Sequence, residues 1–203
     1  MILRVSRSER GYHHGDLASA LERAAFELID ESGHAKVSLR EVARRADVSH
    51  NAPYHHYGDR AALLAHLGAV AMEELLEDLE SALRSADPAD APARAVRVAS
   101  AYIENAARHP ARFRLVNDPD ICDLREPSPT MAPLLDRVHG ILAQVVDELD
   151  PATAPPLQAA LRTALWGAVH GLAELVVTGQ VNQTDTEPAL QALLSRGEFG
   201  REK

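Results

Sequence analysis

The sequence predicts an all-α protein, and three observations lead to this prediction. Alanine and leucine are the commonest residues, aromatic residues make up only 4% of the 203 positions, and apolar residues recur every three or four positions over long segments. No segment alternates apolar with polar side chains, as a half-buried strand does. We therefore expect about nine helices and no strand.

The first predicted helix covers residues 16–31. Asp16 is expected to cap its N-terminus, and Gly33 follows its last turn in the position where a helix commonly stops. The apolar residues of this segment share one face, which would pack against two further helices. Those positions are Leu17, Leu21, Ala24, Ala25, Leu28 and Ile29.

Residues 37–64 carry the pattern of two short helices joined by a tight turn. Ser38 can cap the first of these helices, with Glu41 three positions later as in a capping box. The pattern then breaks, and Ser49 can cap a second element that extends to His56 and begins with hydrogen-bonding side chains. This is the layout of a DNA-reading helix-turn-helix, whose second helix enters the major groove.

The remaining chain predicts a helical body. Its first and longest helix is capped by Asp59, and an exposed loop at 118–129 interrupts the later ones. The expected helices are 59–85, 93–108, about 111–117, 130–149, 155–179 and 186–196. The predicted domains are a three-helix helix-turn-helix head at 1–58 and an α-helical ligand-binding and dimerisation domain at 59–203.

A short aromatic and histidine-containing sequence, Tyr54-His55-His56-Tyr57, ends the second helix-turn-helix element and is followed by Arg60. It matches the signature of the tetracycline-repressor (TetR/AcrR) transcription factors, and the resemblance covers residues 10–65. Beyond this range, Trp166-Gly167-Ala168-Val169-His170-Gly171 and the segment 12–17 look like a subgroup of that family named for a Trp-His-Gly motif.

The resemblance implies a set of contacts with the DNA backbone. The residues at the matching positions are Ser38, Arg40, Tyr54, His55 and Arg60. Base edges are instead expected to meet the side chains at the start of the second element, Ser49, His50 and Asn51, of which Asn51 suits adenine. Two roles are possible for His56: it could pack within the protein or contact DNA.

The net charge of −9 is unevenly distributed. Residues 1–62 hold nine Arg and Lys against nine Asp and Glu, which leaves twelve against twenty-one for the rest. Arg4, Arg7 and Arg10 form a basic arm before the first helix. An acidic body behind a neutral head would orient the head toward phosphates, and an acidic surface also serves solubility.

The segment 155–179 predicts a homodimer. It is apolar on nearly every side, so the helix should be buried nearly all round, and a second copy packed about a two-fold axis would cover it. The alternative is the central helix of a monomer. The expected interface residues are Leu161, Leu165, Ala168, Leu172, Leu175, Val176, Leu190 and Leu194.

Apolar side chains with a few polar groups among them predict a small-molecule pocket in the body. The expected lining is Met72, Leu76, Tyr102, Phe113, Met131, Leu135, Val138, His139, Trp166 and His170. The same residues would equally suit a plain core, and Trp166 with His170 would then be a packed pair.

No sequence motif of an enzyme, a cofactor or a metal site is present. His13-His14 and His55-His56 lack the spacing of metal ligands, and the single Cys122 excludes a disulfide framework. Neither a signal peptide nor a membrane span is evident, so a cytoplasmic protein without a membrane partner is expected.

Together these patterns predict a TetR-type regulator that is not an enzyme and needs no cofactor. Its expected partners are a palindromic double-stranded DNA operator, a second copy of the chain and a small-molecule effector that releases a repressor from the operator. The alternative is a helical ligand-binding or enzymatic protein with a vestigial DNA-binding head.

Overall fold

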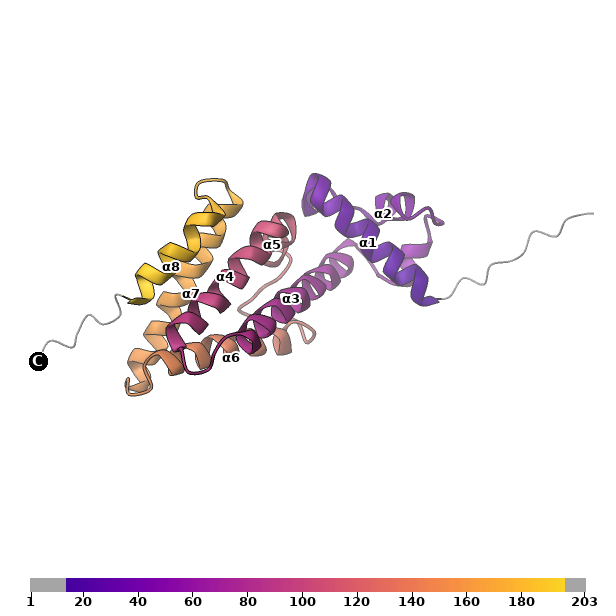
Figure 1. The fold of residues 1–203 in the computed structure, drawn as a ribbon. Helices are drawn as coiled ribbons and strands as arrows, with labels where there is room; N and C mark the ends of the chain where they lie inside the picture. Colours follow the sequence, from indigo (N-terminus) through magenta and orange to yellow (C-terminus); the bar gives the residue numbers. More distant parts are fainter. Residues whose placement is uncertain (1–13, 196–203) are drawn as a thin grey trace, which may run out of the picture. The chain divides into compact units, whose positions relative to one another are not determined.

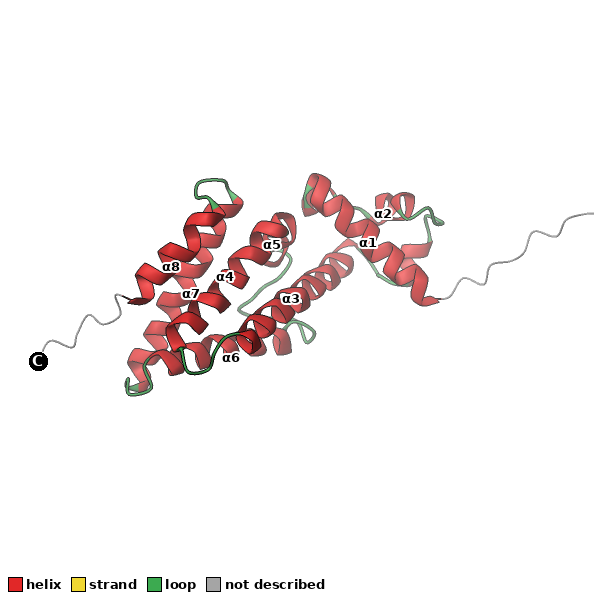
Figure 2. Ribbon diagram, viewed as in Figure 1, coloured by secondary structure: helices red, strands yellow, loops and turns green. Residues whose placement is uncertain are grey.

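The computed structural model describes residues 14–195, with side chains from 17 to 194. The arm with Arg4, Arg7 and Arg10 lies outside the described residues. The described residues form eight α-helices and three short 3-10 helices and contain no strand (Figure 2). This confirms the predicted all-α fold. None of the described helices is both long and apolar enough to cross a membrane.

The chain divides into two compact units, residues 1–63 and 64–203 (Figure 1). The sequence placed the boundary earlier, after residue 58. The difference arises from the first turn of the long helix α3 (Arg60–Ser85), which belongs to the first unit. Leu63 in that turn has no exposed surface.

The first unit is a small helical bundle. It contains α1 (His14–Ser32), η1 (His34–Lys36), α2 (Leu39–Arg45) and η2 (Ala52–His55). Gly33 has φ 78°, and its N–H donates to the carbonyl of Ile29 at 2.8 Å, which confirms it as the stop of α1. Asp16 lies inside α1, not before it, so the predicted cap is wrong.

Apolar side chains hold this unit together. Leu21, Ile29 and Val42 are completely buried, and Val37 is 2% exposed. They come from α1, α2 and the segment between them, so the helical spacing read from the sequence identifies this core correctly.

The second unit is built around one central helix. It contains most of α3, then α4 (Ala91–Arg108), α5 (Pro110–Val116), α6 (Ala132–Leu149), α7 (Pro155–Val177), η3 (Gln183–Asp185) and α8 (Thr186–Ser195). The central α4 contacts α5, α6, α7 and α8.

Two aspartates fix helix starts. The carboxylate of Asp59 accepts the N–H of Ala62 at 2.8 Å, and that of Asp90 accepts the N–H of Ala93 at 3.0 Å. The cap at Asp59, which starts α3, was predicted from the sequence. The cap at Asp90 starts α4 at Ala91, two positions before the predicted start at 93.

The α3 helix passes very close to the loop before α6 at Gly68. A Cβ at this position would lie 2.6 Å from Sγ of Cys122. The thiol is buried, and burial raises the pKa of Cys122 to about 11. The glycine therefore serves close packing at a position inside a helix, where its conformational freedom is ordinarily a cost.

Replacing Gly68 by alanine should destabilise the protein by about 1–2 kcal/mol, because the clash with the thiol exceeds the gain in helix propensity of about 0.5–1 kcal/mol. Urea unfolding measures the change. In a Cys122→Ala background the same substitution should instead stabilise. A gain in stability in both backgrounds would show that the loop moves away at little cost.

Candidate nucleic-acid interface and cavity

The start of α2 is fixed by Ser38. Its backbone is extended (φ −136°, ψ 150°), and its hydroxyl oxygen accepts the N–H of Glu41 at 3.2 Å. The carboxylate of Glu41 does not complete the predicted capping box, because it pairs with Arg44 one turn further on. The predicted cap is therefore confirmed and the reciprocal bond is replaced by an ion pair.

A tight turn follows α2 and is built on Asp47. This residue has φ 54°, the left-handed conformation that glycine usually supplies. The N–H of Asp47 donates to the carbonyl of Arg44 at 3.3 Å, and the N–H of Val48 donates to that of Ala43 at 3.0 Å. These two bonds form a Schellman motif, which ends α2 and reverses the chain.

The second element of the helix-turn-helix is shorter than predicted. The sequence suggested a helix from Ser49 to His56, whereas the structure has a turn at 50–51 and then the 3-10 helix Ala52–His55. The N–H of Ala52 donates to the carbonyl of Ser49 at 2.8 Å. This bond spans three residues, as in a 3-10 helix, and not the four residues of an α-helix. The hydroxyl oxygen of Ser49 accepts the N–H of Asn51 at 3.4 Å.

The side chains of this element divide between surface and core. Those predicted to meet DNA are all exposed: Ser49, His50, Asn51, Tyr54 and His55, with Ser38 and Arg40 on α2. Tyr54 has 55% of its surface exposed, which is high for an aromatic residue. Between Val48 and Gly58 there is no Asp or Glu. The element thus presents hydrogen-bonding groups without negative charge.

Burial distinguishes His56 from the aromatic residue that follows it, while a DNA contact by His56 stays a prediction. His56 is exposed, whereas its neighbour Tyr57 is 7% exposed and packs in the core. The two ring centroids lie 6.3 Å apart. The aromatic residue that ends the signature is therefore the structural member of the pair.

Arg45 joins α2 to α1. Its guanidinium binds both carboxylate oxygens of Glu31, at 2.6 and 2.8 Å, and reaches Glu27 at 3.3 Å. The hydrogen bond from Arg45 lowers the pKa of Glu31. Two carboxylates of α1 are thereby neutralised within the same unit.

Arg60 has a role within the protein that its place in the signature does not reveal. Its Nε donates to the carbonyl of Val37 at 2.8 Å, and one Nη donates to the carbonyls of His34 and Ala35 at 2.8 and 3.2 Å. The side chain thus ties the start of α3 to η1. A phosphate contact by Arg60 stays a prediction.

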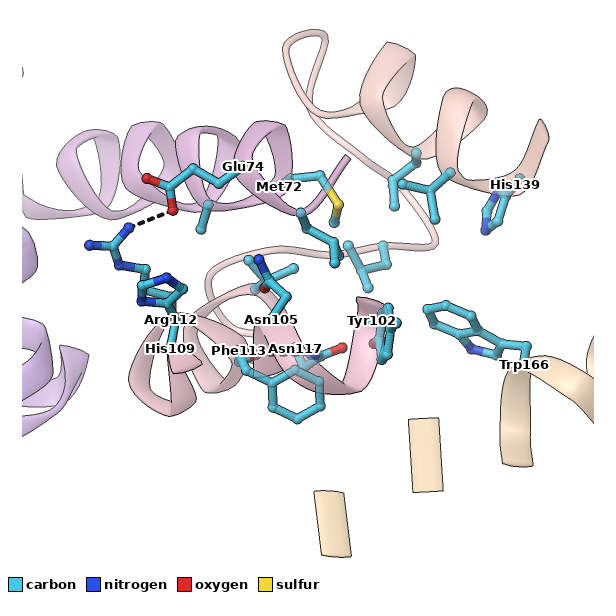
Figure 3. Close-up of a pocket in the computed structure, with 16 residues that line it drawn as sticks. Met72, Glu74, Tyr102, Asn105, His109, Arg112, Phe113, Asn117, His139 and Trp166 are labelled. Atoms are coloured by element: carbon cyan, nitrogen blue, oxygen red, sulfur yellow. Dashed lines mark hydrogen bonds and ion pairs between the residues drawn. The ribbon is translucent and has the colours of Figure 1, made fainter. Parts of the chain in front are cut away.

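The second unit contains a cavity of about 150 Å³ (Figure 3). Its walls come from α3, α4, α5, α6, α7 and the loop before α6. Most of the predicted lining residues are there: Met72, Tyr102, Phe113, Leu135, Val138, His139 and Trp166. The sequence therefore identified the apolar wall from helical spacing.

Three predicted lining residues lie elsewhere. Leu76 and Met131 are 1% and 4% exposed and belong to the packed core. His170 does not line the cavity, because its Nδ1 is hydrogen-bonded to the hydroxyl of Tyr102 at 2.9 Å and its ring stacks on Trp166. Burial raises the pKa of Tyr102, which keeps this hydroxyl uncharged.

The polar side of the cavity was missed by the sequence analysis. It consists of Glu74, Asn105, His109, Arg112 and Asn117. Arg112 of α5 forms an ion pair with Glu74 of α3, as Figure 3 shows. With seven residues, α5 is too short for periodicity to indicate which polar side chains face inward.

The predicted dimer face needs correction. Leu190 is completely buried within its own chain, and the same core partly covers Leu165, Leu172, Val176 and Leu194. Val169 and Ala173 are the inward residues of α7. Leu161 is 39% exposed and Ala168 and Leu175 are half-buried, so these three remain candidates.

Two further leucines are exposed on the last two helices. Leu157 on α7 and Leu193 on α8 expose 57% and 49% of their surface. With Leu161 they are the large aliphatic side chains left uncovered among the described residues. The uncovered apolar surface thus lies on the last two helices.

Comparison with known families identifies the chain. Residues 21–67 match the model of the tetR family of bacterial regulatory proteins, and residues 95–196, half of the chain, match the tetracyclin repressor-like C-terminal domain. The first match covers the helix-turn-helix and the second most of the cavity unit. The protein belongs to the TetR family of transcriptional regulators. The likeness to the Trp-His-Gly subgroup stays a prediction.

Individual relatives agree with this family. An HTH-type transcriptional repressor of Mycobacterium tuberculosis is 33% identical over 124 residues, which are 61% of this chain and 60% of that protein. The chain thus spans about 60% of the length of the curated relatives it matches.

Solved structures show the same fold. A protein of unknown function from Rhodococcus sp. RHA1 has a TM-score of 0.79 and 27% identity, covering 93% of this chain and 98% of that one. The regulator FadR from Bacillus subtilis, in complex with stearoyl-CoA, has a TM-score of 0.68 at 17% identity, covering 89% and 98%.

Proposed function

We propose that this protein is a homodimeric DNA-binding repressor that leaves its operator when a small molecule occupies the cavity of the second unit. The observation that carries the proposal is the set of exposed polar side chains between Ser49 and His55, in a segment without Asp or Glu that follows the tight turn at Asp47. This segment lies in the part of the chain that matches the tetR family.

DNA recognition divides between two sets of side chains. Ser49, His50 and Asn51 stand at the beginning of the element, where a recognition helix meets base edges. Tyr54 and His55 follow on its exposed side and would hold phosphates, which fixes the register without reading the sequence.

Dimerisation would place two such elements on one operator. Leu157, Leu161 and Leu193 supply exposed apolar surface for the contact. A Cβ at Gly167 or Gly171 would meet no atom of the chain within 4 Å, so a second helix has room to approach α7 at these points. A two-fold dimer reads a palindrome with half-sites about 34–36 Å apart.

Release of DNA would follow from linkage. Met72 and Glu74 of α3 line the cavity, and α3 continues without a break to Arg60 in the DNA-binding unit. A ligand that binds best to one position of α3 favours one separation of the two DNA-binding elements. If that separation does not fit the operator, ligand and DNA weaken each other's binding.

The proposal is tested by selecting duplexes from a random pool with the full-length protein. The expected result is a palindromic sequence whose half-sites are one helical turn apart. If no sequence is enriched over repeated rounds, the result would favour the alternative, a helical ligand-binding or enzymatic protein whose DNA-binding head is vestigial.

Replacing Asn51 by alanine should cost about 1–3 kcal/mol of binding free energy on the selected operator and leave random DNA unaffected, because a base contact carries the sequence information. Competition titrations on both DNAs measure this. Tyr54→Phe is the matched control, and it should weaken binding to both DNAs alike. An Asn51 variant equally impaired on random DNA would contradict the assignment of this side chain to a base.

A further inference from the structure

We propose that the ligand of the cavity is an uncharged molecule the size of one substituted benzene ring, with a hydrogen-bonding group such as a hydroxyl or an amide. This inference rests on the proposed function, in which the cavity is the effector site. Three properties of the cavity lead to it: its volume, its aromatic wall and the charge balance of its lining.

The volume sets the size of the ligand. This cavity has a volume of about 150 Å³, and a purely apolar cavity of that volume accommodates benzene. The polar side of the present cavity leaves room for a substituent on such a ring. A long acyl chain such as that of stearoyl-CoA has several times this volume, and the packed helices around the cavity would have to separate to admit it. The ligand in the structure of FadR therefore does not indicate the ligand of this protein.

The aromatic wall favours a ring. Tyr102 meets Phe113 edge to face, with centroids 6.2 Å apart at 80°, and meets Trp166 at 5.4 Å and 69°. Aromatic pairs prefer this arrangement, and a further ring in the cavity would extend it. The flexible thioether of Met72 lies across the cavity in Figure 3 and can adapt to the ring.

The charge balance favours a neutral ligand. Arg112 and Glu74 line the cavity and pair with each other. A charged ligand would lose its hydration and find no uncompensated charge as a partner. Asn105 and Asn117 are the neutral polar groups of the lining. One N–H of each amide is already used, by Asp78 and by the carbonyl of Phe113 respectively. The second N–H and the oxygen of each amide suit a hydroxyl or an amide substituent.

Binding of small ring compounds to the full-length protein tests this inference without DNA. The probes are benzyl alcohol and benzamide, with benzoate and benzylammonium as charged counterparts of the same ring, and stearoyl-CoA. Calorimetry gives the affinities. Trp166, the one tryptophan of the sequence, lines the cavity, so its fluorescence reports whether a probe enters there.

The expected result is saturable binding of the neutral probes, at least tenfold tighter than that of the charged ones, with a change in Trp166 emission. Tighter binding of benzoate or of stearoyl-CoA would overturn the inference, as would the absence of saturable binding by both neutral probes.

Two charge variants sharpen the test. Glu74→Gln removes the carboxylate that pairs with the guanidinium of Arg112. The affinity for benzoate, relative to that for the neutral probes, should therefore rise by about tenfold or more. Arg112→Gln should raise the affinity for benzylammonium relative to that for the neutral probes. Circular dichroism confirms that each variant is folded. An unchanged preference order in both folded variants would show that the ion pair does not select the ligand.

The two proposals fail in different ways. Neutral probes that bind at Trp166 but leave DNA binding unchanged would contradict release by the ligand and support the ligand class. DNA binding without any binding of neutral ring compounds would contradict the ligand class alone.

Discussion

Replacing Leu161 by glutamate should convert the dimer into a folded monomer and lower operator affinity by about 10²–10⁴-fold, the gain that linking two binding modules provides. Leu161 is 39% exposed on α7, so a charge there is tolerated in the single chain. In a dimer the charge would be desolvated and would meet its own copy across the two-fold axis.

Light scattering and circular dichroism measure assembly and folding. Ser81→Glu is the control: this residue is exposed on α3, a helix that carries none of the three exposed leucines, so the dimer should persist. Leu172, the position that the sequence alone suggested, is less suitable because it packs partly on its own core. A fully dimeric Leu161→Glu protein with wild-type operator affinity would place the interface elsewhere.

Replacing Arg60 by alanine should lower the free energy of unfolding by about 2–4 kcal/mol, because charge-assisted hydrogen bonds contribute about 1.5–3 kcal/mol each and this side chain is partly exposed. It donates to the carbonyls of His34, Ala35 and Val37. Binding to specific and random DNA should weaken together. Urea unfolding and anisotropy titrations measure the two effects.

Two variants separate structural and phosphate roles. Arg60→Lys keeps the charge but offers its donors from one nitrogen, which cannot reproduce the separated Nε and Nη bonds of the guanidinium, so it should also be destabilised. Arg40 is exposed and forms no hydrogen bond with another described residue. Arg40→Ala should change stability by less than about 0.5 kcal/mol and reduce the salt dependence of DNA binding by about one unit. An Arg60→Ala protein as stable as wild type would assign Arg60 to DNA alone.

Features governed by local chemistry were predictable from the sequence. Ser38 and Asp59 cap helices because a short oxygen-bearing side chain can reach an N–H two or three residues later, and Gly33 stops α1 because it tolerates a positive φ. Helical spacing likewise identified much of the core and most of the apolar wall of the cavity.

Features set by tertiary packing were not predictable in the same way. Leu190, Leu193 and Leu194 lie on the ten-residue helix α8, where periodicity alone does not show which leucine faces the protein. Leu190 is completely buried and Leu193 is exposed. On α7, which is apolar on most sides, only packing distinguishes the inward Val169 from the outward Leu161.

The second element of the helix-turn-helix shows a third limit to prediction from sequence. The pattern from Ser49 to His56 suits the start of a helix, but a tight turn through the carbonyl of Ser49 shortens the element to Ala52–His55. The multiple hydrogen bonds of Arg60 to η1 join segments more than twenty positions apart, so the local sequence gave no sign of them.

The central claim is that a dimer of this protein binds DNA sequence-specifically. The most direct test is the ratio of its affinities for the operator and for an unrelated duplex. Fluorescence anisotropy at a single fixed salt concentration gives the affinity of the full-length protein for the selected operator and for a shuffled duplex of the same composition. We predict a ratio of at least about 10³, with one dimer bound per operator. Equal affinities for the two duplexes would contradict the account.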